Sequence, residues 1–322
     1  MIRQNLPTFT NIHSDIITKP EETTDSWYLR TNFISEGHII GFEWHQMVVR
    51  PLLILSMSVM DFLVMDATDD IYLSHEVSGR ATASNGPIKG KCCVNSKYGC
   101  FQGDEHKQKL DLVADDSEIH VEVYPKKAIH NGCTGLLPLA GLNSYQFSFP
   151  NADIKGTVTI KGKTYHIENA VAWFDRQWTK ASIKDVDSPH WLWLGMNLNK
   201  ENTVSMSAWD VVKDRNKWGC FATIVDENDV HALHPISITY KELWDSKLTK
   251  NKYPKKFHVS IPTADTEMDF SVLQKDPEFY KGFGKFAMGG SQALCKVTGH
   301  YQSEVIDSIE IVEVLGDFGG NL

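Results

Sequence analysis

Apolar and polar residues alternate along much of the chain. The clearest case is the segment 156–160, which is followed by the pair Lys161-Gly162 and by a second alternating run over 163–167. Alternation with a period of two is typical of a strand that buries one face, and glycine readily adopts the positive φ that a tight turn requires. The pattern therefore predicts a β-hairpin over 156–167.

Similar alternating segments recur in both halves of the chain, and long runs with the period of an amphipathic helix are missing. In the second half, short polar turns separate the alternating runs, which predicts successive antiparallel strands. The expected strands cover Trp27–Asn32, His38–Arg50, Ile54–Met65, Ile71–Ser78, Thr203–Val212, Trp218–Val225, Val230–Leu233, Phe257–Ile261, Met268–Leu273 and Ser291–Val314.

Many short strands at this spacing predict an all-β fold built from barrels or sandwiches. Barrel closure removes exposed strand edges, so two antiparallel β-barrels in tandem are the simplest arrangement for a chain of 322 residues. The segment Lys180–Pro189 is polar and ends in proline, as a connection between domains often is. We therefore expect an N-terminal barrel over residues 1–185 and a C-terminal barrel over residues 186–322.

Composition limits the possible partners. The formal charge is -9 and basic residues occur only in short runs such as Lys126-Lys127, which argues against a nucleic-acid partner. No stretch of eighteen apolar residues occurs, and the first residues lack an apolar leader, so the sequence predicts a cytoplasmic protein without a membrane span. Nothing in the sequence specifies an oligomeric state.

The cysteines and glycines do not form a cofactor motif. The six cysteines are irregularly spaced, and no Cys/His pair with zinc spacing follows Cys92-Cys93, so reduced thiols are expected. His75-Glu76 lacks the second histidine of a zinc protease motif, and the glycines of 282–290 lack the spacing of a phosphate-binding loop. The sequence therefore predicts neither a metal nor a cofactor.

Tryptophans gather in two places near the expected domain boundary. The stretch Ala172–Trp178 combines two indoles with an acid and a guanidinium, and Trp191-Leu192-Trp193 follows the boundary. Aromatic rings with a few polar groups are typical of a pocket for an apolar ligand, and we expect the two clusters to face each other. The predicted ligand-binding residues are Trp44, Tyr145, Trp173, Gln177, Trp178, Trp191, Trp193 and Trp209.

The strand expected over His38–Arg50 offers a choice between two neighbouring side chains. Successive side chains of a strand point to opposite faces, so only one of Trp44 and His45 can point into the first barrel. We expect Trp44 to point inward, and we expect His45 to be an ordinary core or surface histidine.

Several motifs, taken in order, resemble the lipocalin-like family that includes carotenoid 1,2-hydratases, kievitone hydratase, AttH-type bacterial proteins and natural-product Diels–Alderases. The resemblance spans nearly the whole chain and implies two lipocalin-like β-barrels, with ligands in a barrel mouth or between the domains. Its carriers are Ser26-Trp27-Tyr28-Leu29 before a strand ending in Arg50, Phe62–Asp66 with Tyr72–Glu76, Ser144–Pro150, Trp173–Trp178, Trp191–Trp193, and Tyr253-Pro254 before Phe257–Pro262.

Two departures from the family pattern concern the chemistry. Carotenoid hydratases have Asp-His-x-Trp where this chain has Asp175-Arg176-Gln177-Trp178, and Tyr-x-Asp where it has Ala208-Trp209-Asp210. Arginine cannot shuttle a proton near neutral pH. The resemblance thus carries over Asp175, Trp178 and Asp210 as site residues. The two departures weaken a hydratase assignment.

The leading functional hypothesis is a cofactor-free cyclase of the pericyclase or isomerase type, acting on an apolar polyene, polyketide or terpenoid in natural-product biosynthesis. Such a reaction needs a cavity that orients the substrate and a donor such as Arg176, Tyr145 or Gln177. Asp175, Arg176 and Asp210 are the predicted catalytic residues.

Three alternatives stay open. The first is an alkene hydratase in which Asp175 or Asp210 protonates the double bond. The second is a non-catalytic carrier of a hydrophobic ligand. In the third, Asp175 and Arg176 form a structural pair that closes a barrel end while the indoles belong to the core.

Overall fold

A computed structural model describes residues 7–19, 21–52, 55–80, 92–139, 142–180, 190–213, 216–281 and 288–320 of the protein. Helical structure in these ranges is limited to α1 (Ile12–Asp15) and the short 3-10 helices η1 (Asn131–Cys133) and η3 (Pro262–Ala264). All paired strands run antiparallel, so the predicted all-β fold is confirmed. No helix in the described ranges is long and apolar enough to cross a membrane.

The first sheet contains thirteen strands and follows the order β4-β3-β2-β1-β13-β11-β8-β7-β6-β5, with β9, β10 and β12 also paired to β11. Its strands are β1 (Thr24–Ser35), β2 (His38–Leu52), β3 (Leu55–Asp66), β4 (Ile71–Arg80), β5 (Cys92–Asn95), β6 (Gly99–Gly103), β7 (Gln108–Ala114), β8 (Ser117–Tyr124), β9 (Ile129–His130), β10 (Leu136–Leu139), β11 (Leu142–Ile160), β12 (Lys163–Ile167) and β13 (Val171–Thr179).

The second sheet contains ten strands in the order β17-β16-β15-β14-β23-β22-β20-β19-β18, with β21 also paired to β22. Its strands are β14 (His190–Asn197), β15 (Ser205–Lys213), β16 (Asn216–Val225), β17 (His231–Pro235), β18 (Ser237–Asp245), β19 (Lys252–Ile261), β20 (Thr266–Val272), β21 (Phe279–Lys281), β22 (Met288–Tyr301) and β23 (Glu304–Leu315).

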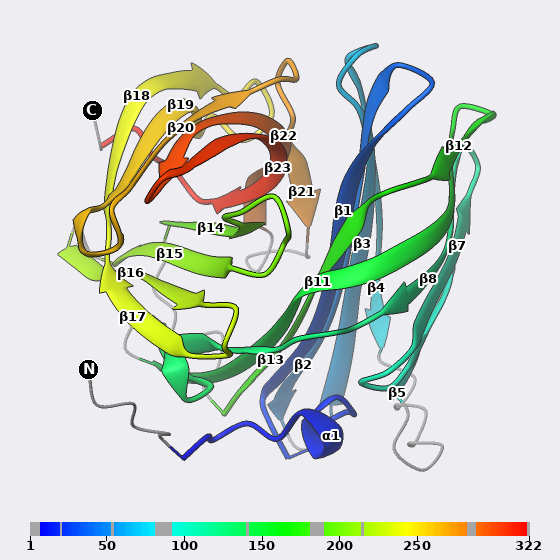
Figure 1. The fold of residues 1–322 in the computed structure, drawn as a ribbon. Coiled ribbons are helices and arrows are strands. Elements are labelled where there is room, and N and C mark those ends of the chain that lie inside the picture. Colours follow the sequence, from blue (N-terminus) through cyan, green and yellow to red (C-terminus); the bar gives the residue numbers. More distant parts are fainter. Residues whose placement is uncertain are drawn as a thin grey trace.

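Each sheet curls into an antiparallel half-barrel, and the two lie side by side (Figure 1). This confirms the expected pair of lipocalin-like barrels. The predicted hairpin is also present, because Ile160 pairs with Lys163 across the Lys161-Gly162 turn. The first sheet ends at Thr179 and the second begins at His190. The expected boundary at residue 185 lies outside the described residues and stays a prediction.

Each half-barrel encloses its own apolar core. In the first, Trp44 stacks on Phe101 with ring centroids 4.8 Å apart, and Phe101 stacks on Phe174 at 5.6 Å. The expectation that Trp44 points inward is therefore confirmed. In the second, Phe257 stacks on Phe270 at 4.6 Å. Both cores follow from strand alternation, which sends every second side chain to the inner face.

Strands β1 and β13 of the first sheet contact β14, β15 and β23 of the second. Asn32 Nδ2 donates to the Ile309 carbonyl at 2.7 Å, and a third apolar cluster contains residues of both sheets, including Tyr28, Trp173 and Trp193. We call this contact region the seam. Its strands are buried on both faces, because one face lines a barrel and the other meets the neighbouring sheet.

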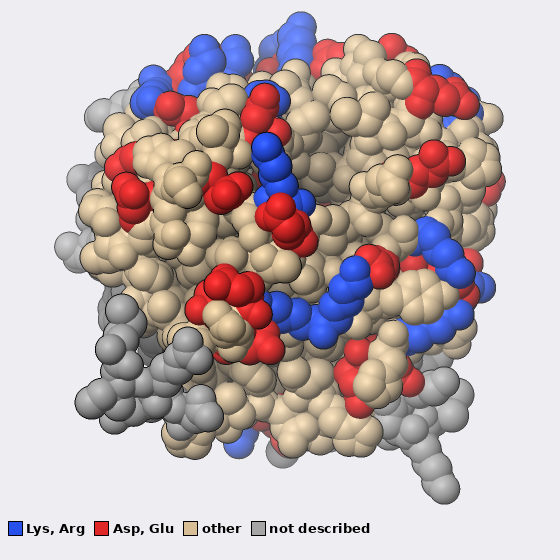
Figure 2. Space-filling view, viewed as in Figure 1, with Lys and Arg blue, Asp and Glu red and all other residues tan. Residues whose placement is uncertain are grey.

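Charged side chains of both signs are interspersed on the face shown in Figure 2, with Lys and Arg beside Asp and Glu. Such mixing differs from the broad basic surface that a nucleic acid would attract. The absence of a nucleic-acid partner stays a prediction.

The long strand β11 depends on one glycine. Gly156 has φ of 141°, and a Cβ at this position would lie 2.0 Å from the carbonyl oxygen of His120 on β8. We expect Gly156→Ala to lower the free energy of unfolding by about 1–3 kcal/mol, because the backbone must move to remove the clash. Gly79→Ala is the control, since a Cβ there meets nothing within 4 Å. Equal urea midpoints for the two variants would contradict this account.

Candidate functional site

A cavity of about 160 Å³ lies in the seam between the two half-barrels. Its walls come from both sheets, so neither half could form it alone. The cavity confirms that the two tryptophan clusters face each other, and its predicted lining residues are Asp175, Gln177, Trp178, Trp191, Trp193 and Trp209.

Strand register builds one wall from the first sheet. Tyr28 on β1 pairs with His45 on β2 and with Asp175 on β13, and Asp175 pairs in turn with Ser148 on β11. Register partners on adjacent strands point to the same face of a sheet. This row therefore places a phenol, an imidazole and a carboxyl side by side at the seam.

The facing wall is a shorter row from the second sheet. Trp193 on β14 pairs with Trp209 on β15 and with Glu313 on β23. The Trp193 ring meets Tyr28 edge-on across the seam, with centroids 5.3 Å apart. Trp191 Nε1 donates to Glu313 at 3.3 Å and so holds that carboxylate at the edge of the cavity.

Asp175 is the acid that faces this aromatic wall. Its Oδ1 accepts hydrogen bonds from the Ser148 hydroxyl and, at 2.9 Å, from Trp173 Nε1. Burial raises the pKa of Asp175 to about 6, although the bonds from Ser148 and Trp173 and the charge of Arg30 act in the opposite direction. The carboxyl therefore keeps its proton at a higher pH than an ordinary aspartate and can donate it to a ligand.

Two further donors lack partners. Within the described ranges, the Tyr28 hydroxyl and Trp209 Nε1 are buried and have no hydrogen-bond acceptor, yet both residues line the cavity. A buried donor without an acceptor costs about 1–3 kcal/mol. A ligand that offers an acceptor atom would recover that free energy.

The sequence motif is divided between two faces of β13. Trp173, Asp175 and Gln177 point to the seam, whereas Phe174 and Arg176 point into the first barrel, because side chains alternate along a strand. Asp175 and Arg176 thus do not share an environment.

Arg176 lies inside the first barrel and away from the cavity. It is fully buried and forms an ion pair with Asp25, which is also fully buried. It donates to the carbonyls of Ser26 at 3.0 Å and Ile17 at 2.7 Å, and its guanidinium lies 4.3 Å from the Trp27 ring. These contacts indicate a structural role that joins the N-terminal segment to β1 and β13.

The remaining predicted residues are placed around the site. Asp210 points into the second barrel, where its Oδ2 accepts from the Tyr240 hydroxyl at 2.8 Å. Tyr145 stacks on Trp178 with centroids 5.8 Å apart, and Trp44 belongs to the first core. Trp173 is buried beside the cavity and orients Asp175.

Sequence reasoning missed Tyr28, His45, Gln146 and Glu313 as lining residues. Only His45 carried a signal, because a strand with Trp44 inward must turn His45 outward. The others reach the cavity through long-range register, which the local pattern does not specify.

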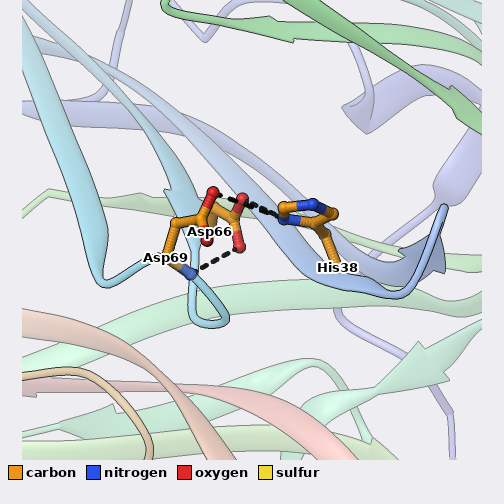
Figure 3. A group of neighbouring side chains, drawn as sticks. All are labelled: His38, Asp66 and Asp69. Atoms are coloured by element: carbon orange, nitrogen blue, oxygen red, sulfur yellow. Dashed lines mark hydrogen bonds and ion pairs between the residues drawn. The ribbon is translucent and has the colours of Figure 1, made fainter.

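One group outside the cavity has the composition of a metal site. Ligand atoms of His38, Asp66 and Asp69 lie within 4.8 Å of one another (Figure 3). However, both Asp66 oxygens already accept hydrogen bonds, including those from the backbone N–H groups of Thr68 at 2.9 Å and Asp69 at 3.2 Å. Lys163 Nζ lies 3.1 Å from His38 Nε2, where a cation would compete with a metal. The hydrogen bonds of Asp66 stabilise the turn between β3 and β4, and this structural role accounts for the grouping of the three side chains.

Comparison with other proteins gives a consistent result. A family model described as AttH-like matches residues 7–288. An AttH-type protein from Nitrosomonas europaea has a similar structure, with a TM-score of 0.77 and 17% identity over 97% of this chain and 99% of that chain. No curated protein matches the chain in sequence.

Two further solved structures are similar over nearly their full lengths. Kievitone hydratase from Nectria haematococca has a TM-score of 0.77 and 18% identity, covering 98% of this chain and 97% of that chain. CghA has a TM-score of 0.64 and 12% identity, covering 98% of this chain and 96% of that chain. At these identities the likeness concerns the fold.

The placement of Arg176 leads to a stability prediction. We expect Arg176→Ala to lower the free energy of unfolding by about 3–5 kcal/mol, because it leaves Asp25 as a buried charge without its main partner. The control is Lys241→Ala, which breaks the exposed pair with Asp269 and is expected to cost less than about 1 kcal/mol. Urea unfolding measures both, and a small loss in Arg176→Ala would refute the structural role.

Proposed function

The chain belongs to the AttH-like family, and we propose that it is a cofactor-free enzyme that acts on an apolar, unsaturated small molecule in the seam cavity. The supporting observation is Asp175, a carboxyl with a raised pKa that faces indole rings in a cavity shared by both half-barrels. Proton donation from such a group to a carbon–carbon double bond needs neither a metal nor an organic cofactor.

Addition of water to the double bond is the reaction that this geometry supports best. Asp175 gives its proton to one alkene carbon, and the positive charge on the other carbon faces Trp193 and Trp209, whose π-clouds stabilise cations. A water molecule then forms the new carbon–oxygen bond and returns a proton to the Asp175 carboxylate. The same residues catalyse loss of water in the reverse direction.

Two observations agree with this choice. Kievitone hydratase shares the fold over nearly the whole chain. The cavity also favours an apolar ligand, because most of its surface is apolar and four tryptophans line it.

Ring closure is the second candidate, and the unpartnered donors Tyr28 and Trp209 favour it. Both could hydrogen-bond a substrate carbonyl and polarise it, while the rings hold a diene and a dienophile together. Arg176 and Tyr145, which the sequence suggested as donors, belong to the first barrel interior and its edge, so Tyr28 takes that role in this proposal.

The first test compares two buried aspartates. Native mass spectrometry of the purified protein identifies its co-purified ligand, whose conversion then serves as the assay. We expect Asp175→Asn to lower kcat/KM by roughly 100- to 10,000-fold, because the amide cannot donate a carboxyl proton. Asp210→Asn is the matched control and should keep near wild-type activity, since Asn still accepts from Tyr240. A larger loss of kcat/KM in Asp210→Asn than in Asp175→Asn would identify Asp210 as the acid instead.

The pH dependence follows from the raised pKa of Asp175. The protonated form is the active one and predominates below about pH 6, so kcat/KM should decrease as the pH rises through that value. Asp175→Asn should lack this transition in its residual activity. A rate that increases over the same interval would indicate that Asp175 acts as a base.

Isotope labelling distinguishes the two reactions. In water enriched in oxygen-18, hydration places the label in the product, whereas ring closure leaves it unlabelled. Mass spectrometry of the product provides the measurement. A ring product without the label would show that the reaction is cyclisation and not hydration. Binding without any conversion would show that the protein is a carrier.

A further inference from the structure

A second and larger cavity, of about 400 Å³, lies at the other end of the seam. The same strands build both cavities. On β13 the seam-facing side chains run from Gln177 and Asp175 in the first cavity to Trp173 and Val171 in the second. The rings of Trp173 and Trp193, with centroids 5.9 Å apart, separate the two spaces.

The second cavity arises where two strands of the second sheet separate. Strand β14 pairs with β23 from Trp191 to Leu194 only, so Gly195 lies beyond the ladder. Its carbonyl accepts instead from Arg30 Nη2 of the first sheet. Arg30 thus inserts into the gap between β14 and β23. Gly195 leaves room for the neighbouring Trp173 ring, because a Cβ there would lie 2.6 Å from that ring.

The Arg30 guanidinium is buried but incompletely paired. It forms an ion pair with Glu310, in which Nη1 and Oε2 lie 3.7 Å apart, which is longer than a hydrogen bond. Within the described residues Arg30 Nε is buried and has no acceptor, although Arg30 lines the cavity. Open volume beside a buried, unused donor is the pattern of a polar ligand site.

The charges around this cavity favour an anion. Burial raises the pKa of Glu310 to about 7, even though Arg30 and Ser308 lower it, so much of this acid is neutral at neutral pH. Lys200 also lines the cavity, and the lining acid Asp307 is paired with Lys296.

Two other titratable groups approach the pair from neighbouring strands. Glu43 is the register partner of Arg30 on β2, and Cys295 is that of Glu310 on β22. Burial raises the pKa of Cys295 well above its usual value, so the thiol adds no charge at neutral pH, and neither residue belongs to the described cavity lining. Among the lining residues, Arg30 and Lys200 carry two positive charges against the one negative charge of Asp307 when Glu310 is protonated.

We propose that this second cavity binds a small organic carboxylate, whose oxygens accept hydrogen bonds from Arg30 and from the protonated Glu310 carboxyl. The anion takes the place of an ionised Glu310 as the counter-charge of Arg30. Binding is therefore coupled to proton uptake by Glu310 at a pH above the pKa of that group. This inference concerns a second site and does not depend on the reaction in the first cavity.

Isothermal titration calorimetry of the full chain with sodium benzoate tests the site. Benzamide is a neutral probe of the same shape, and benzylamine is a cationic one. We expect benzoate to bind at least about tenfold more tightly than either, as the loss of a charge-assisted hydrogen bond implies. At pH 8, titrations in buffers of different ionisation enthalpy should reveal up to one proton taken up per benzoate.

Three variants locate the effect. Glu310→Gln should abolish the proton uptake and keep benzoate binding. Val305→Trp, at an exposed lining residue of the second cavity, should weaken binding by about tenfold or more, whereas Gln177→Trp in the first cavity should not. Absence of benzoate binding, equal affinity for benzamide, or proton uptake that persists in Glu310→Gln would overturn the proposal. Because no turnover is measured, failure here is distinct from failure of the proposed reaction.

Discussion

The structure depends on strands that are buried on both faces. Strand β13 sends Phe174 and Arg176 into the first barrel and Trp173 and Asp175 toward the second sheet. A strand in this position has no solvent-facing side on which to place polar residues. Every polar group it carries must therefore find a partner in the interior or remain neutral.

The two charged residues of β13 meet this constraint in different ways. Arg176 cannot lose its charge near neutral pH, so it is surrounded by Asp25 and backbone carbonyls inside the first barrel. Asp175 can lose its charge, and burial raises its pKa to about 6. Burial thus gives Arg176 a structural role, whereas it leaves Asp175 with a proton that a ligand can reach.

Alternation along the chain was enough to predict the strands, the 156–167 hairpin and the inward direction of Trp44. The local motif alone does not show that Asp175 and Arg176 have different roles, although strand geometry places adjacent side chains on opposite faces. The same rule, applied to Trp44 and His45, gave the correct result. Neighbours in sequence are thus poor guides to a site that is built on strands.

Much of the site was beyond prediction because it is assembled across strands. Asp175 acquires its surroundings from Tyr28, which precedes it by a large part of the chain, and from Glu313 near the other end. Strand register determines these contacts, and register in a long sheet depends on all its turns and cores together. Tryptophans were easier to identify because a large ring is informative even without its neighbours.

The two cavities share a wall that can carry charge effects between them. Trp173 donates its N–H to Asp175 in the first cavity, and the Arg30 guanidinium lies 5.7 Å from its ring on the side of the second. The positive charge of Arg30 lowers the pKa of Asp175. An anion beside Arg30 would offset that charge, and the pKa of Asp175 would rise further. If the second cavity binds an anion as proposed, its occupancy therefore changes the pKa of Asp175 in the first cavity.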